Sequence, residues 1–141
     1  YDSSDLGSMR LLVAAALAER VSRFRLLSSY GAGGMGAYPK MKGECERMVR
    51  EAGNIRWTIF RPSALISPDE FGESHLGKRE VPGFAVAVGN GLRLIPGLAG
   101  WADDIRPIPI DVVARAILAT LESPRDGEIL SGRDLWILGV A

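Results

Sequence analysis

Three neighbouring stretches decide the fold: Phe24-Arg-Leu-Leu-Ser-Ser29, Tyr38-Pro-Lys-Met-Lys-Gly-Glu44 and Trp57-Thr-Ile-Phe-Arg-Pro-Ser63. The first and third are short apolar runs, and the third is rich in aromatic and β-branched residues, which is typical of buried strands. The second opens a run with apolar residues at helical spacing that stops at Gly53-Asn54. A strand, a helix and a strand in this order predict parallel strands joined by a right-handed crossover.

The same alternation extends to both sides of these stretches. We expect helices over about 11–19 and 38–52, strands at 24–28, 56–61 and 128–130, and a helix that Asp111 caps and Ser123-Pro124 ends. Residues 136–138 end an apolar tail that we expect to dock on another surface, in this chain or in a partner. The predicted fold class is α/β, a partial doubly wound, Rossmann-like parallel sheet.

Two of the predicted helices have apolar stripes that we expect to face the sheet. The stripe of the first helix comprises Leu11, Leu12, Ala15, Ala16 and Val21. That of the second comprises Met41, Cys45, Met48 and Val49. Residues 67–109 are rich in glycine and proline, and there we expect a helical turn at 84–88 and a short extended piece at 92–95.

Composition limits the classes of function. The chain has 141 residues, 47% of them hydrophobic, which is enough for one domain with a core. Lys+Arg and Asp+Glu both number 17, so a zero net charge argues against nucleic acid as a partner. No apolar run reaches the roughly 20 residues of a membrane-spanning helix. One histidine, His75, and one cysteine, Cys45, give no ligand cluster, so we expect no metal site and a buried structural thiol.

Tyr38 and Lys42 suggest acid–base chemistry. Four residues apart on a helix, their side chains lie on one face. An ammonium beside a phenol favours the phenolate, which gives an acid able to exchange a proton near neutral pH. Ser29, or Ser28, at the end of the preceding strand is placed to hydrogen-bond the same substrate oxygen. Serine, tyrosine and lysine then make a constellation suited to the reduction of a carbonyl.

In these motifs and their order, the chain resembles the short-chain dehydrogenase/reductase superfamily, and most closely its atypical, epimerase-like members. The Lys-Gly-Glu continuation after Tyr38 and the Phe-Arg-Pro strand ending are similar to the oxidoreductase-like branch typified by the Tat-interacting tumour suppressor. The resemblance runs from about residue 11 to residue 130 and corresponds to the C-terminal half of such a protein. It implies three parts: an active-site half of the Rossmann core at 1–66, substrate-region loops at 67–109, and a C-terminal helix, strand and tail at 110–141.

The resemblance also implies roles for individual residues. Tyr38 exchanges the proton with a carbonyl or hydroxyl substrate, Lys42 binds the nicotinamide ribose, and Ser29 orients the substrate oxygen, with Ser28 as the alternative. The cofactor is NADP or NAD, and its contacts are Ser28, Tyr38, Lys42, Pro62, Ser63, Ala64 and Leu65. Arg106 lies where epimerase-like relatives often have a substrate-contacting arginine, although a surface cation paired with Asp103 or Asp104 is the interpretation we favour.

A competing interpretation concerns Gly31-Ala-Gly-Gly-Met-Gly36, which fits the G-x-G-x-x-G dinucleotide fingerprint between a strand and a helix. Residues 28–30 separate the strand from the first glycine, and the next strand ends in Arg61-Pro62 instead of an acidic residue. Both features disfavour the fingerprint, although an arginine is able to meet a 2′-phosphate.

The nucleotide-binding first half of the superfamily has no counterpart before Tyr1, so the first strand's outer edge is expected to be unpaired. The chain is then part of a longer reductase, or a second polypeptide supplies the missing half, or the chain is a degenerate structural or regulatory subunit. A homodimer through the 11–19 and 38–52 helices is left open. We expect a cytoplasmic location, with an organelle matrix as the alternative.

Overall fold

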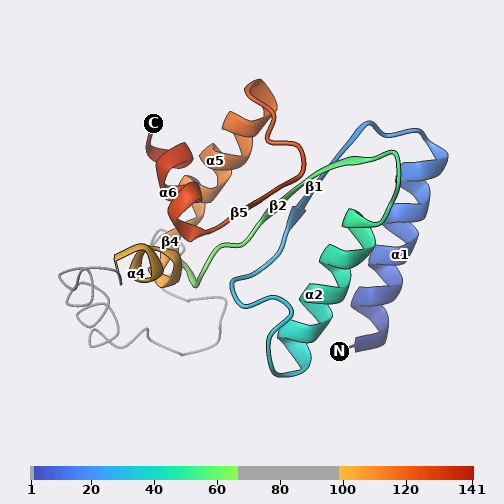
Figure 1. Cartoon of the computed structure of the whole chain (residues 1–141), viewed down its shortest axis with the longest axis horizontal. Helices are drawn as coiled ribbons and strands as arrows, with labels where there is room; N and C mark the ends of the chain where they lie inside the picture. The colour runs from blue at the N-terminus through green and yellow to red at the C-terminus, as the bar shows by residue number, and fades with distance from the viewer. Residues whose placement is uncertain (1, 67–98) are drawn as a thin grey trace. The chain divides into compact units, whose positions relative to one another are not determined.

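The computed structural model describes residues 2–66 and 99–141, in which helices and strands alternate (Figure 1). In chain order the elements are α1 (Asp2–Ala18), β1 (Arg23–Leu27), α2 (Ala37–Arg50), β2 (Arg56–Phe60), β3 (Leu65–Ile66), α4 (Ala99–Ile105), β4 (Ile108–Pro109), α5 (Ile110–Glu122), β5 (Glu128–Leu130) and α6 (Gly132–Val140). They form two compact units. Unit 1 comprises the described residues up to Arg61 with Pro124–Leu130, and unit 2 comprises the rest.

Unit 1 contains a three-stranded parallel sheet in the order β1-β2-β5. Leu26 lies beside Ile59 in the first pair, and Ile59 beside Ile129 in the second. The parallel α/β architecture predicted from the sequence is confirmed. The ends of β1, α2, β2 and β5 lie within two residues of the predicted ones, whereas α1 begins at Asp2, well before the predicted start at about residue 11. Among the described residues, β1 pairs along one edge only.

Helices α1 and α2 pack together in unit 1, and α2 also contacts β1 and β2. The buried core beneath them consists of Val13, Leu26, Met41, Cys45, Val49 and Ile59. The predicted inner face of α2 is therefore correct, with Met48 partly buried at its margin.

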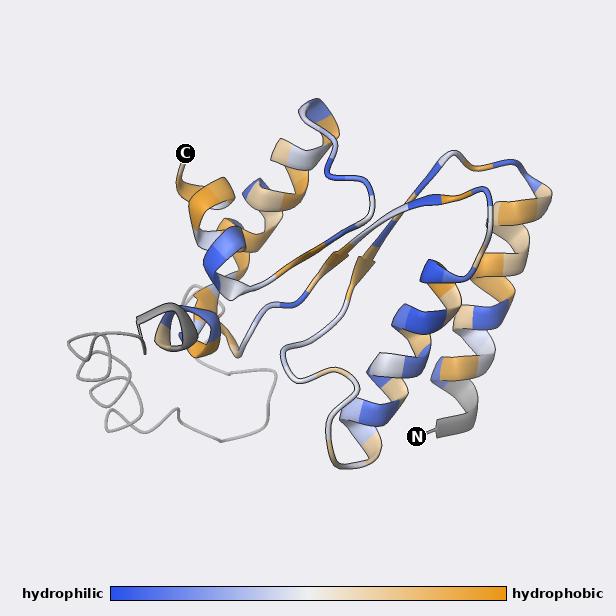
Figure 2. Ribbon diagram, viewed as in Figure 1, coloured by the Kyte–Doolittle hydropathy of each residue, from blue (hydrophilic) through white to orange (hydrophobic). Residues whose placement is uncertain are grey.

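The predicted inner face of the first helix is correct at Ala16 and wrong at its other positions, Leu11, Leu12, Ala15 and Val21, which are exposed. Leu11 and Leu12 are 73% and 56% exposed, whereas Val13 and Ala16 are buried. The reason is that the helix begins at Asp2, and its apolar stripe is set by Leu6, Met9 and Val13, which follow one another at spacings of three and four residues. Figure 2 shows that hydrophobic residues recur along α1, which obscures the correct face in the sequence.

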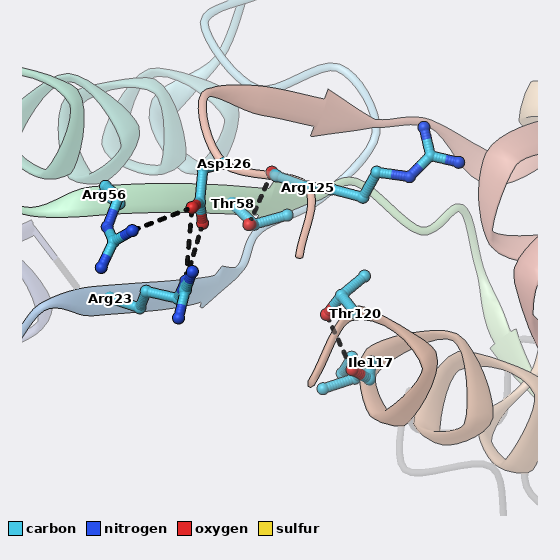
Figure 3. Close-up of polar contacts among 7 residues, drawn as sticks. All are labelled: Arg23, Arg56, Thr58, Ile117, Thr120, Arg125 and Asp126. Atoms are coloured by element: carbon cyan, nitrogen blue, oxygen red, sulfur yellow. Dashed lines mark hydrogen bonds and ion pairs between the residues drawn. The ribbon is translucent and has the colours of Figure 1, made fainter. Parts of the chain in front are cut away.

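Asp126 joins the strands of unit 1 at their amino ends (Figure 3). Its carboxylate accepts from Arg23 Nε at 3.2 and 3.3 Å and lies 3.9 Å from Arg56 Nη1. Beside it, Thr58 Oγ1 donates to the carbonyl of Arg125 at 2.8 Å. These contacts hold the turn before β5 against the starts of β1 and β2.

Unit 2 combines the parallel pair β3–β4 with α4, α5 and α6. Val112, Val113, Ala116 and Leu135 are buried where α5 and α6 pack, and Gly139 lies against the carbonyl of Val112 with no room for a Cβ. Within α5, Thr120 Oγ1 donates to the carbonyl of Ile117 (Figure 3).

Two expectations in unit 2 are settled by these helices. The apolar tail does dock, but as helix α6, which begins with a capping box between Ser131 and Asp134. Asp111 does not cap α5, because Pro109 occupies the N-cap position. Asp111 lies in the first turn of the helix, where its Oδ2 is 2.9 Å from Arg115 Nη1. The expectations at 84–88 and 92–95 lie outside the described residues.

Candidate functional site

Tyr38 and Lys42 lie together at the start of α2, which follows the carboxyl end of β1. Lys42 Nζ is 5.6 Å from the centroid of the Tyr38 ring, as the four-residue spacing predicts. Tyr38 is 52% exposed, so its side chain is open to solvent. An ammonium and an accessible phenol therefore share one face of the helix.

The two serines after β1 have different environments. Ser28 is buried, and its Oγ donates to Glu46 Oε1 at 2.5 Å. Ser29 is less buried, and its Oγ donates to the carbonyl of Tyr30 at 3.2 Å. The Ser28 hydroxyl is held in the interior by a carboxylate. The Ser29 hydroxyl makes a longer, weaker and exposed hydrogen bond.

Glu46 is a functional candidate that the sequence did not reveal. Its carboxylate is buried on α2 and accepts from Arg61 Nε at 2.9 Å and from Arg61 Nη2 at 2.5 Å, as well as from Ser28. The hydrogen bonds from Arg61 to Glu46 raise the pKa of the guanidinium further above its already high value. One signal was available: Glu46 follows Lys42 by four residues and Tyr38 by eight, which places all three along one side of α2.

The glycine-rich turn at 31–36 uses its own amides. Ala32 N donates to the carbonyl of Ser29, Gly33 N to that of Pro39, and Gly34 N to that of Gly31. A pyrophosphate needs such amides to be free, so the turn does not support the dinucleotide fingerprint. Its glycines have another role: Gly36 has a φ of 103°, which a residue with a Cβ rarely adopts.

The predicted cofactor contacts at 62–65 belong to unit 2. Pro62 is buried, and the Ser63 hydroxyl donates to the carbonyl of Arg106. The carbonyl of Ala64 accepts from Ile108 N at 2.9 Å, and Leu65 begins β3. This segment is therefore fixed to β4 and to the residue before Pro107.

Arg106 stacks on an aromatic ring in unit 2. Its guanidinium carbon lies 4.3 Å from the centroid of Trp136, whose buried Nε1 has no hydrogen-bond partner in the described part of the chain. An open cavity of about 320 Å³ is lined here by Asp103, Arg106, Arg133, Trp136, Ile137 and Val140. Asp104, one of the partners expected for Arg106, accepts from the backbone N–H of Arg133 at 3.1 Å.

Cys45 is buried in the core of unit 1, as predicted, with its Sγ 3.8 Å from Met41 Sδ. Burial raises the pKa of its thiol, since the thiolate would lose its hydration. Within residues 2–66 and 99–141, no three His, Cys, Asp or Glu side chains gather in a way that could hold a metal ion. His75 lies outside the described residues.

The parallel sheet and the Tyr38–Lys42 helix are features of NAD(P)-binding proteins of the short-chain dehydrogenase/reductase type. Residues 23–117 match the NAD-binding family described as male sterility protein, and the chain belongs to this atypical, epimerase-like family. Family membership implies a nucleotide cofactor. The placement in a narrower branch stays a prediction.

Curated relatives include fungal proteins named "Protein fmp52, mitochondrial". The chain is 36% identical to that of Aspergillus fumigatus over 118 residues, which cover 81% of this chain and 46% of the relative. It is 37% identical to that of Aspergillus niger over 117 residues, which cover 80% of this chain and 46% of the relative. The chain thus spans about half the length of these relatives. None of the helices in the described residues has the length and apolar character needed to cross a membrane.

Proposed function

We propose that the protein is an NAD(P)-dependent oxidoreductase that interconverts a carbonyl and a hydroxyl group on a small molecule. The observation that supports this most directly is the Lys42 ammonium 5.6 Å from the centroid of the exposed Tyr38 ring. An accessible phenol beside a cation, after the carboxyl end of a parallel strand, is suited to proton transfer at a bound substrate.

The proposed reaction divides the work between cofactor and protein. When bound, the nicotinamide cofactor supplies the hydride for reduction or accepts it for oxidation. Tyr38 donates its hydroxyl proton to the substrate oxygen as the carbonyl is reduced, and in the reverse direction its phenolate takes that proton back. Lys42 offsets the charge left on the phenol oxygen. Ser29 turns its hydroxyl from the Tyr30 carbonyl to the substrate oxygen, because Ser28 is engaged by Glu46.

The residues of this chain fit one end of the cofactor. Lys42 and Tyr38 offer an ammonium and a hydroxyl, which suit a nicotinamide ribose, and Pro62, Ser63, Ala64 and Leu65 are proposed contacts of the nicotinamide amide from the family resemblance. The glycine-rich turn does not fit the pyrophosphate, because the amides of Ala32, Gly33 and Gly34 are bonded within the chain. We therefore assign pyrophosphate binding to residues outside this chain, in the rest of a longer protein or in a partner. NAD and NADP are both compatible with this assignment.

We also propose that the regions 1–66, 67–109 and 110–141 serve as active-site half, substrate region and C-terminal segment. The relatives are named mitochondrial, which favours the organelle matrix over the cytoplasm as the protein's location.

The test uses the full-length protein with NADH and NADPH and a panel of small aldehydes and ketones. Nicotinamide absorbance reports turnover, and fluorescence titration reports cofactor binding. Tyr38→Phe removes the proton donor and is expected to lower kcat by at least about a hundredfold, within the usual range for loss of an acid–base group, while binding persists. Tyr30→Phe, at another exposed tyrosine, is the matched control. Equal activity of both variants would refute the assignment of Tyr38.

A second candidate is a non-catalytic structural or regulatory subunit. It is favoured by the single-sided pairing of β1 among the described residues and by the exposed apolar side chains of Leu11 and Leu12. This function predicts no turnover in the wild-type protein and no effect of Tyr38→Phe on partner binding. Turnover that depends on Tyr38 would exclude it.

A further inference from the structure

We infer that Glu46 and Arg61 form a positioning pair that sets α2, and with it Tyr38, against the carboxyl ends of β1 and β2. The inference rests on the oxidoreductase function proposed above. Neither side chain contacts the substrate in this scheme; both act through the placement of Tyr38, Lys42 and Ser29.

Glu46 connects helix α2 to the ends of two strands. Tyr38, Lys42 and Glu46 follow one another at four-residue intervals along one side of α2. The Glu46 carboxylate receives its hydrogen bonds from Ser28, the residue after β1, and from Arg61, the residue after β2. One carboxylate thus ties the tyrosine-bearing helix to the ends of two neighbouring strands. A shift of the helix along the sheet would break these bonds.

The Glu46 carboxylate depends on its hydrogen-bond partners, because it is buried. Glu46 is 2% exposed, so its charge loses nearly all hydration and needs the guanidinium and the hydroxyl as replacements. Arg61 is only partly buried, and an ion pair with a buried member adds little net stability compared with apolar residues of similar volume. It does restrict geometry, because the planar guanidinium meets the carboxylate through two parallel hydrogen bonds. Precise placement explains such a pair better than stability does.

The pair also affects the two serines that follow β1. Leu26 and Ser28 are buried and Leu27 is exposed, which is the alternation of an extended chain. Fixing Ser28 inward on Glu46 therefore directs the following residue, Ser29, to the other side. The pair consequently decides which of the two hydroxyls is available to a substrate.

A single substitution gives the first test, in the full-length protein. Glu46→Gln keeps the size of the side chain and removes its charge. Its matched control is Glu44→Gln, which alters an exposed carboxylate paired with Arg47 on the same helix. We expect Glu46→Gln to lower kcat by about tenfold or more with little change in substrate KM, because misplacement of reacting groups affects the rate more than ground-state binding. Glu44→Gln should match the wild type.

A triple substitution separates positioning from stability. Ser28→Ala, Glu46→Met and Arg61→Met together replace the network by apolar groups and leave no buried charge unpaired. Such a replacement is expected to keep the melting temperature near that of the wild type. If the pair positions Tyr38, kcat per folded molecule stays below the wild-type value in this variant. Recovery of wild-type kcat along with the melting temperature would overturn the inference.

A third measurement is independent of turnover. The aromatic NMR signal of ¹³C-labelled Tyr38, assigned with Tyr38→Phe, reports the contact between its ring and Lys42. We expect the signal to move in Glu46→Gln and in the triple variant, and to stay in place in Glu44→Gln. A wild-type protein without turnover would refute the proposed function. An unchanged Tyr38 signal in these variants would refute the positioning role, whether or not the wild-type protein turns over a substrate.

Discussion

Gly43 on α2 packs directly on Gly33 of the glycine-rich turn. A Cβ at position 43 would lie 2.7 Å from Gly33 Cα and 2.8 Å from Gly33 N, closer than van der Waals contact allows. Gly43 follows Lys42, so this contact joins the turn after β1 to the helix turn with the proposed catalytic pair. The glycines of the turn are thus explained without a bound phosphate: Gly31, Gly33 and Gly36 have positive φ angles, and Gly34 packs against the carbonyl of Gly31.

Gly43→Ala is therefore expected to destabilise the protein by roughly 1–3 kcal/mol, the usual cost of inserting a group into a packed site. Turnover should also fall, since the turn and the start of α2 must separate. Gly7→Ala is the matched control: Gly7 lies in α1 with nothing within 4 Å of the added Cβ. There alanine should stabilise the helix by about 0.5–1 kcal/mol. Urea unfolding measures both changes, and equal effects would contradict the packing described here.

Cys45 should make stability depend on pH above neutrality. Burial raises the pKa of its thiol, the carboxylates of Asp5, Glu44 and Glu46 act in the same direction, and Lys42 opposes them. The unfolded thiol ionises near its ordinary pKa of about 8.5, whereas the folded thiol keeps its proton. The contribution of Cys45 to the free energy of unfolding is thus complete below that pH. It is lost as the pH rises through the pKa of the thiol in the folded protein.

Two measurements check the Cys45 prediction. Unfolding free energy from about pH 7 to pH 10 should fall less steeply in Cys45→Ala than in the wild type. A thiol-specific disulfide reagent should react slowly with folded protein and rapidly in urea, since the buried thiol is neither accessible nor ionised. Fast reaction in the native state would show that the thiol is not enclosed.

The sequence predicted the parts of the fold that depend on local signals. Met41, Cys45 and Val49 recur every four residues before Gly53, and this period identifies both α2 and its inner face. The Tyr38–Lys42 contact follows from the same helical geometry. In α1 the local signal was ambiguous, because Leu11 and Leu12 are as apolar as the residues that are buried.

The Glu46–Arg61 pair could not be predicted in this way. Its partners are fifteen residues apart and meet only because α2 packs across β2. The inward orientation of Ser28 was within reach, since alternation from Leu26 places positions 26 and 28 on one side. The fingerprint interpretation of residues 31–36 could be tested only with the hydrogen bonds of the turn, which the sequence does not specify.

Asp126→Asn should weaken the amino ends of the strands in unit 1. The substitution removes the charge that Arg23 and Arg56 share (Figure 3). These side chains are partly exposed, so we expect a loss of about 1 kcal/mol at most, smaller still at high salt. Glu128→Gln, which breaks the exposed pair with Arg125, is the control and should cost less. A larger loss for the control would mean that Asp126 does not join these strands.

Val13 and Leu11 test which face of α1 is buried. Val13→Ala should cost roughly 1–3 kcal/mol, because its side chain belongs to the core with Leu26 and Ile59. Leu11→Ala should change the unfolding free energy by no more than about 0.5 kcal/mol, since Leu11 is 73% exposed and alanine favours helix. Urea unfolding of the purified protein compares the two. If Leu11→Ala proved the more costly in the full-length protein, a surface beyond the described residues would have to cover that side of the helix, as the structural-subunit hypothesis requires.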